Sequence, residues 1–257
     1  IKDAYEDQEK HIYALEMGIS SNPAMNWRVS SLDKYVLLAN SDMHSLPKIG
    51  RDLNMFEMPE KNLSFNSIMG AMKSKDKKIF KKTLKYFPEE GRYHFDGHRP
   101  CVVSVDPDKY KLTMCPSCGK KLVIGVLHRV NDLADREPGQ MPSTAIPYMS
   151  LVPLREVIAY AMRKAQTSVV VEQTYQKLIN SVGTEYDILV ETDPAKIKES
   201  STEDIAQSIQ NIRDGKITII PGYAGVFGKV DLLNREPKIN MSSEWKQKGL
   251  KQFEGSA

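Results

Sequence analysis

The chain has 257 residues, 40% of them hydrophobic, which is enough for one large or two modest cores and indicates a globular protein. Its 36 basic and 33 acidic residues give a formal charge of +3, a balance that does not by itself indicate a nucleic-acid-binding protein. The longest apolar runs are far shorter than the roughly 20 residues of a membrane-spanning helix, so we expect a soluble protein with no membrane partner.

The predicted elements of the first half are short apolar strands and one helix. Residues 12–17 and 35–39 are apolar runs bounded by turn residues and predict buried strands. Residues 64–73 carry apolar side chains at helical spacing, and residues 79–87 predict a further strand. Residues 88–122 are rich in loops and contain all three cysteines.

The second half predicts helices followed by a hairpin. Residues 123–134 and 153–165 predict helices, and Pro153 suits the first turn of the second one. Residues 136–153 carry four prolines and predict a domain boundary or linker. The remaining predicted elements are two helices, 169–179 and 202–213, and two strands, 217–220 and 226–232, joined by a tight glycine-containing turn.

The cysteines and the start of the chain indicate its cellular context. All three cysteines lie between Cys101 and Cys118, which suits a metal site in a reducing compartment better than a disulfide framework. We therefore expect a cytoplasmic protein. The sequence begins with Ile1 and shows no charged-then-apolar leader, so we expect a fragment of a longer protein.

Two pairs of potential metal ligands predict a zinc site. His98 pairs with Cys101 and Cys115 with Cys118, each across a two-residue gap, and thirteen residues separate the pairs. Each pair can fold as a tight knuckle, and four nitrogen and sulfur ligands suit tetrahedral Zn²⁺. Because a closed four-ligand shell leaves no position for water, we expect this zinc to be structural. His94 is an alternative fourth ligand.

A second candidate metal site follows the strand predicted at residues 35–39. Alternation along an extended strand would place Asp42 and His44 on the same side, where a carboxylate and an imidazole can bind one metal ion. A polar cluster after a strand is also typical of an ordinary turn. The residues alone leave both interpretations open.

Candidate DNA contacts lie in two segments. Residues 73–85 contain seven lysines opposed by a single Asp76, and such a face can neutralise phosphates, with Lys78, Lys81 and Lys82 as the selected contacts. A solvated helix-to-strand connection explains the same pattern. The second segment is Asn26, Trp27 and Arg28, which suit stacking on and hydrogen bonding to an extruded base, although a tryptophan is more often a core residue.

The tail contains a possible partner-binding peptide. Gln247, Leu250 and Phe253 have the spacing of a sliding-clamp-binding peptide, whose apolar anchors would lie on one face of a short helical turn. The usual second aromatic residue is replaced by Glu254, so a chance match is the alternative. Residues 221–228 are rich in glycine but lack the order of a phosphate-binding loop, and we interpret them as a hairpin.

Five segments, in this order, resemble the endonuclease Q family over roughly residues 10–235: residues 14–21, 25–28, 40–45, 91–99 and 124–130. The resemblance implies a PHP domain, in which strands and helices gather histidines and carboxylates around several metal ions. It implies that Asp42 and His44 are ligands of that active-site cluster, filled by Zn²⁺, Mg²⁺ or Mn²⁺. It also maps the family's cysteines onto Cys101, Cys115 and Cys118.

From this resemblance we predict a mixed α/β fold. Residues 1–87 would be the C-terminal part of a PHP-like lobe, a distorted β/α barrel, and residues 88–136 a small zinc-knuckle subdomain. Residues 137–235 would be an α+β lobe of helices with a small hairpin, and residues 236–257 a tail with the clamp-binding peptide.

The activity that the resemblance implies is hydrolysis of DNA 5′ of deaminated bases such as uracil, hypoxanthine and xanthine, by a metal-dependent repair endonuclease. The family's opening His-x-His motif has no counterpart in this sequence, so we expect the fragment alone to be a poor nuclease. Two alternatives remain. One is a zinc-stabilised DNA- or protein-binding module that does not need Asp42 and His44, and the other is a PHP phosphatase of a small substrate.

Overall fold

The computed structural model describes residues 1–235. The clamp-peptide residues Gln247, Leu250 and Phe253 lie outside this range. Within it, the helices are α1 Lys2–Tyr5, α2 Pro23–Trp27, α3 Phe65–Ser74, α4 Val126–Leu133, α5 Leu154–Met162, α6 Val169–Ser181, α7 Pro194–Ser200 and α8 Glu203–Arg213. The strands are β1 Ala14–Glu16, β2 Val36–Leu38, β3 Leu53–Phe56, β4 Phe80–Lys85, β5 Asp96–His98, β6 Val103–Val105, β7 Tyr148–Ser150, β8 Thr218–Ile220 and β9 Lys229–Asp231. None of these helices is long and apolar enough to cross a membrane.

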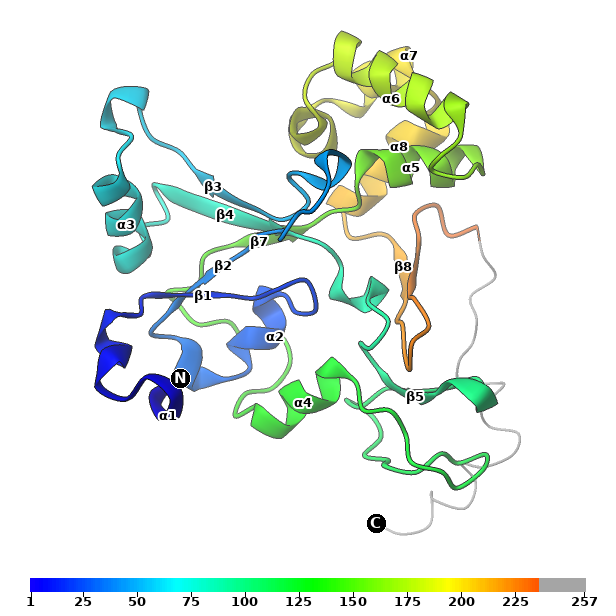
Figure 1. The fold of residues 1–257 in the computed structure, drawn as a ribbon. Coiled ribbons are helices and arrows are strands. Elements are labelled where there is room, and N and C mark those ends of the chain that lie inside the picture. The colour runs from blue at the N-terminus through cyan, green and yellow to red at the C-terminus, as the bar shows by residue number, and fades with distance from the viewer. Residues whose placement is uncertain (236–257) are drawn as a thin grey trace.

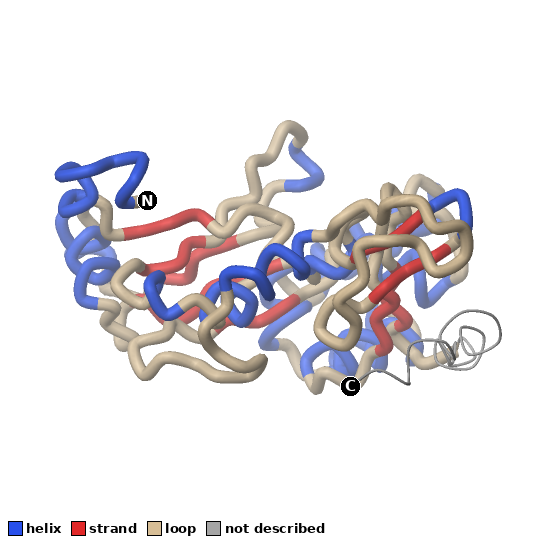
Figure 2. The backbone as a smooth tube through the Cα atoms, turned by 90° about the horizontal axis from the view of Figure 1, so that it is seen from below, coloured by secondary structure: helices blue, strands red, loops and turns tan. Residues whose placement is uncertain are grey.

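The described strands form four small sheets. β1 pairs in parallel with β2, whereas β4 lies between an antiparallel β3 and a parallel β7. The other two sheets are antiparallel hairpins, β5 with β6 and β8 with β9. α3 lies at one end of β3 and β4, and α5 to α8 gather at the other end (Figure 1). Seen from below, the helices nearest the N-terminus lie at one end of the strands (Figure 2).

β7 lies inside the proline-rich stretch that the sequence predicts to be a linker. It pairs with β4, Leu84 lying opposite Met149, and the neighbouring Ile146 is buried with Phe80 and Val36. The stretch that leads into the C-terminal helices is therefore part of a sheet. The expectation of a plain connection is wrong for residues 148–150, because pairing with a distant strand overrides the local proline signal.

The largest core is formed by the C-terminal helices. α8 begins at Thr202, whose hydroxyl accepts a hydrogen bond from the Ile205 backbone N–H, as an N-cap residue should. Its apolar face, Ile205, Ile209 and Ile212, is buried as the periodicity predicts. Each such side chain contributes about 1.5–3 kcal/mol when fully buried. The core also takes in buried apolar side chains of α5, α6 and α7, together with Leu84 of β4.

A buried ion pair fixes the end of β4. Lys85 is fully buried, and its Nζ lies 2.7 Å from Asp52 Oδ2 and 2.5 Å from the Gly18 carbonyl oxygen. The other carboxylate oxygen of Asp52 accepts a hydrogen bond from the Tyr86 backbone N–H at 3.0 Å. Lys85 is therefore not part of an exposed lysine face, contrary to the pattern at residues 73–85, because its charge is paired with the Asp52 carboxylate inside the protein.

Candidate functional site

The four predicted zinc ligands come from two short segments. His98 is the last residue of β5, and Cys101 ends the 3-10 helix that follows it. Cys115 and Cys118 lie in a turn closed by a hydrogen bond from the Gly119 N–H to the Cys115 carbonyl at 2.8 Å. Gly119 has φ +70°, a left-handed conformation that glycine adopts without steric cost. The antiparallel pairing of β5 with β6 holds the first pair of ligands.

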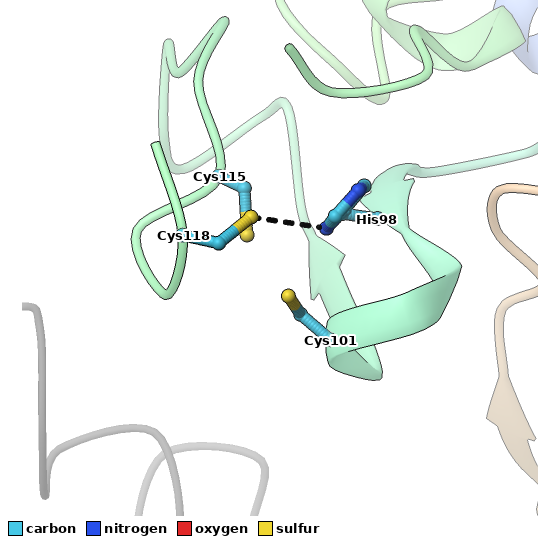
Figure 3. Close-up of side chains that lie close together, drawn as sticks. All are labelled: His98, Cys101, Cys115 and Cys118. Carbon is cyan, nitrogen blue, oxygen red and sulfur yellow. Dashed lines mark hydrogen bonds between the residues drawn. The ribbon is translucent and has the colours of Figure 1, made fainter. Parts of the chain in front are cut away.

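The ligand atoms of the four residues converge. All lie within 4.8 Å of one another, and Cys118 Sγ is 3.5 Å from His98 Nδ1 (Figure 3). Metal–ligand distances of about 2.0–2.3 Å in a tetrahedron place the ligand atoms roughly 3.5 Å apart, so the donor set fits one metal ion. Among residues 1–235 it is the only group of three or more His, Cys, Asp or Glu side chains whose ligand atoms lie close enough together to bind one metal ion. We refer to it as the His98 metal group.

The thiols of this group differ in proton affinity. The backbone N–H of Lys120 lowers the pKa of Cys118, as at cysteines that bind metals as thiolates. The pKa of Cys101 is raised to about 11, first because of its hydrogen bond with Cys118. His94, the alternative fourth ligand, lies outside the group. It is buried, and burial lowers its pKa to about 4.

A second pair of side chains, which the sequence patterns did not single out, joins the His98 metal group to α4. Asp96 on β5 is fully buried. One of its oxygens accepts from the Gly125 N–H at 2.6 Å, and the other lies 2.5 Å from His128 Nδ1. These contacts fix the start of α4 against β5. The only sequence signal was that both residues fall within segments 91–99 and 124–130, which carry the family resemblance.

The structure corrects the argument that brought Asp42 and His44 together. β2 ends at Leu38, and the backbone of the next residue, Ala39, is hydrogen-bonded to the Asn54 side chain. Asp42 and His44 therefore lie in a loop, where strand alternation does not apply. Asp42 has φ +45°, and His44 Nδ1 is 2.8 Å from the Asp42 carbonyl oxygen. Both residues are exposed. Their role as metal ligands stays a prediction.

The predicted base-binding residues make contacts within the protein. Trp27 is half-buried and packs edge-to-face on Tyr148, with ring centroids 5.6 Å apart. Arg28 Nη1 donates to Asn131 Oδ1 at 2.6 Å and so ties α2 to α4. The Asn26 side-chain amide donates to a backbone carbonyl at 2.8 Å. These contacts hold the three residues in place, and base binding stays a prediction.

The selected lysines have different surroundings. Lys78 is exposed and makes no ion pair with any residue that the structure describes. Lys81 pairs with Glu57 at 3.0 Å, and Lys82 lies 5.9 Å from the centre of the Tyr186 ring. Of these three lysines, Lys81 is the one with an acidic partner in the described range, and Lys78 has neither an acidic partner nor an aromatic ring beside it there.

Three acidic residues, Glu90, Glu156 and Asp231, line a cavity of about 350 Å³ between α5 and the β8–β9 hairpin. The pKa of Glu90 is raised to about 7, mainly by burial and then by the charges of Glu156 and Glu89. Burial also raises the pKa of Glu156, which pairs with Arg51 at 3.0 Å. The fold therefore raises the protonated fraction of Glu90 near neutral pH.

This raised pKa predicts a pH dependence of stability. Glu90 contributes at most about 3 kcal/mol to the free energy of unfolding. This contribution is fully present below the ordinary glutamate pKa of 4.5 and is lost as the pH rises towards 7. Glu90→Gln is expected to weaken the pH dependence of the unfolding free energy, measured with urea, between these pH values. Glu199→Gln changes an exposed residue on α7 and should leave that pH dependence as in wild type. Identical pH profiles for wild type and Glu90→Gln would contradict the assignment.

Comparisons of sequence place the chain among longer relatives. Residues 153–216 match the family described as the MJ0043 C-terminal domain. The uncharacterized protein MJ0043 of Methanocaldococcus jannaschii is 29% identical over 230 residues, which is 84% of this chain and 28% of that protein. The uncharacterized protein YqxK of Bacillus subtilis is 30% identical over 223 residues, which is 85% of this chain and 52% of that protein.

Comparisons of structure give the fold. A crystal structure of the lesion-specific endonuclease PfuEndoQ from Pyrococcus furiosus matches with a TM-score of 0.80 and 28% identity, over 94% of this chain and 61% of that one. Endonuclease Q in complex with a 27-mer duplex carrying an abasic lesion matches with a TM-score of 0.74 and 27% identity, over 93% and 60%. The chain thus spans less than two thirds of the length of each of these relatives. The resemblance in its motifs is confirmed, and the chain has a mixed α/β, endonuclease Q-like fold.

Proposed function

We propose that this chain is part of a metal-dependent DNA-repair endonuclease, in which it supplies the closing segment of a PHP-like catalytic lobe and a zinc-stabilised module. The observation that carries the proposal is the match of 94% of the chain to a lesion-specific endonuclease, at an identity of 28%. A mixed α/β fold alone would not support an activity, because one fold can host unrelated functions.

In this proposal Asp42 and His44 are ligands of the catalytic metal cluster. The contact between His44 Nδ1 and the Asp42 carbonyl suits this role, because a metal-binding histidine commonly donates one ring N–H to a carbonyl and keeps the other nitrogen for the metal. The exposed Asp42 carboxylate offers oxygen beside it. Bound metal ions would activate water and neutralise charge on the phosphodiester. Two ligands are too few for such a cluster, so the remaining ligands would lie outside this sequence.

The His98 metal group has a structural role in the proposal, with Zn²⁺ as its ion. Three thiolates and one imidazole are the ligands that zinc prefers, and a four-ligand shell leaves no open position for substrate. The group would hold the module that follows the catalytic lobe, in a reducing compartment where its thiols are not lost to disulfides.

The proposed substrate is duplex DNA that carries a damaged base, with uracil, hypoxanthine and xanthine as the candidates. One structural relative is described with a duplex substrate and an abasic lesion at its active site. Lys78, which makes no ion pair in the described range, is the strongest of the selected lysines for a phosphate contact. Trp27 on α2 remains the candidate for stacking on an extruded base. A sliding clamp remains the candidate partner of the tail peptide.

The decisive experiment is nicking by the full-length protein that carries this chain, on duplexes with a single uracil or hypoxanthine. We expect cleavage 5′ of the lesion, and a loss of roughly a hundredfold in rate for Asp42→Asn, because a weaker ligand removes part of the metal's stabilisation of the transition state. Glu199→Gln, a change at an exposed carboxylate on α7, is the control.

The alternatives give different results in the same experiment. A zinc-stabilised binding module would bind damaged DNA without cutting it, and Asp42→Asn would leave that binding unchanged. A phosphatase would hydrolyse a small phosphomonoester and spare the duplex. Either result from metal-loaded protein would refute the nuclease proposal.

A further inference from the structure

Two segments far apart in the sequence are locked together beside the His98 metal group. They are residues 89–99, which lead into the first pair of ligands, and the loop 221–228 between β8 and β9. Four backbone hydrogen bonds join them: Phe95 N to Gly222 O at 2.9 Å, Gly225 N to Arg92 O at 2.9 Å, Gly222 N to Glu89 O at 2.8 Å and Gly228 N to Glu90 O at 3.0 Å. The tip of this hairpin and β5 lie together (Figure 1).

The approach of the two backbones is too close for ordinary side chains. A Cβ atom added at Gly222 or Gly228 would collide with a carbonyl oxygen of the facing segment, that of Gly91 or Glu89. Glycine is required at both positions for this reason. The joined segments therefore form a rigid support for the side chains that they expose.

Four exposed side chains project from this support: Arg92, Tyr93, Arg99 and Phe227. Phe227 is 67% exposed and Tyr93 51%, although both are large and mainly apolar. The Arg92 guanidinium lies 4.9 Å from the centre of the Phe227 ring. Tyr93 Oη and Arg99 Nη1 come within 3.8 and 3.9 Å of the space where Gly225 would carry a Cβ. We call these four residues the arginine–aromatic surface.

Its positive charge has no acidic partner among residues 1–235. Arg28, Arg51 and Arg136 each pair with a carboxylate within 3.1 Å, but neither arginine of this surface makes such a pair. An arginine stacked on an aromatic ring keeps its outward N–H donors for a phosphate, and exposed rings suit the faces of unstacked bases. The combination fits a polyanion that also presents flat apolar rings.

The His98 metal group is adjacent in sequence to one residue of the arginine–aromatic surface. Arg99 lies between His98 and Cys101, in the 3-10 helix that carries one of the ligands. A metal ion that fixes both neighbours would therefore fix the backbone from which Arg99 projects. This gives the module a use beyond its own folding.

We propose that the arginine–aromatic surface binds DNA, with Arg92 and Arg99 on backbone phosphates and Tyr93 and Phe227 against unstacked bases. The inference rests on the proposed function and adds a contact region to it, because none of the four residues was among the DNA contacts predicted from sequence. Phosphate contacts of this kind would position the strand without reading its sequence.

The test is DNA binding by the full-length protein, measured by fluorescence anisotropy with a lesion-bearing duplex over a series of salt concentrations. Each arginine that contacts a phosphate should contribute about one unit to the slope of log affinity against log salt. We expect the double change Arg92→Gln and Arg99→Gln to lower that slope by about two. Phe227→Leu should weaken binding to a duplex with an unpaired stretch by at least about fivefold, through lost stacking.

Arg163→Gln is the matched control. Arg163 is exposed at the end of α5 and also makes no ion pair in the described part of the chain, so the change removes the same charge from a different lobe. We expect it to change the slope by less than half a unit. Circular dichroism should be unchanged throughout, because the altered side chains are exposed.

The possible failures differ. If wild type binds DNA and the double variant binds equally well with the same slope, the surface is rejected while the nuclease proposal stands. If Arg163→Gln has the same effect per charge, binding responds only to net charge and the surface is again rejected. If wild type does not bind damaged DNA at all, both proposals fail.

Discussion

Cys115→Ser is expected to abolish metal binding and unfold the module around residues 96–123. Cys115 is both a ligand of the His98 metal group and a buried core residue, 2% exposed, packed with Val103, Val105 and Leu122. This core is too small to hold a fold by itself, and structural zinc contributes about 10–16 kcal/mol to folding in small zinc modules. Metal analysis, limited proteolysis and the melting temperature would show the loss.

Ser117→Ala provides the matched control for this change. Ser117 is exposed in the same turn but supplies no ligand, so the variant should keep the metal and its resistance to protease. A strong chelator should reproduce the Cys115→Ser result in wild type. A Cys115→Ser protein that retains one zinc and melts like wild type would contradict both the ligand assignment and the structural role.

Sequence periodicity and ligand spacing predicted the features whose determinants are local. In α8 the cap and the buried face follow from residues within one helix, and Ile205 lies where the period places it. The two ligand pairs form knuckles through short-range turns, so their spacing was informative, and the structure then separated His98 from His94. The four positions converge because β5 and β6 bring two such turns together.

Features that depend on distant partners were not predicted. The proline-rich sequence around β7 predicts a connection, and β7 is a strand because it pairs with the distant β4. The sequence left a continued strand and a turn both open at Asp42, and the hydrogen bonds of the distant Asn54 to the Ala39 backbone accompany the loop that the structure has there. The contact of Asp96 with His128 joins segments that no local pattern connects. In each case the local sequence was compatible with more than one structure, and contacts with residues distant in the sequence determined which one formed.

Asp52→Asn is expected to destabilise the fold by about 3–5 kcal/mol, because it leaves the fully buried Lys85 cation without its carboxylate. If the Asn oxygen accepts the Tyr86 N–H, the amide NH2 donor faces Lys85 Nζ, whose remaining acceptor is the Gly18 carbonyl. If the oxygen instead faces Lys85 Nζ, it is neutral and the Tyr86 N–H loses its acceptor. Urea unfolding followed by circular dichroism measures the loss.

Removing the second charge should restore most of the stability, since an apolar side chain in place of a buried ion pair is often neutral. We therefore expect Lys85→Met combined with Asp52→Asn to be more stable than Asp52→Asn alone. Lys81→Met is the control on the same strand. Lys81 pairs with Glu57, whose carboxylate is 73% exposed, so this change should cost less than about 1 kcal/mol. If Asp52→Asn costs no more than Lys81→Met, then water or a shift of β4 supplies the missing partner, and the buried pair does not hold the end of β4 to the residue that precedes β3.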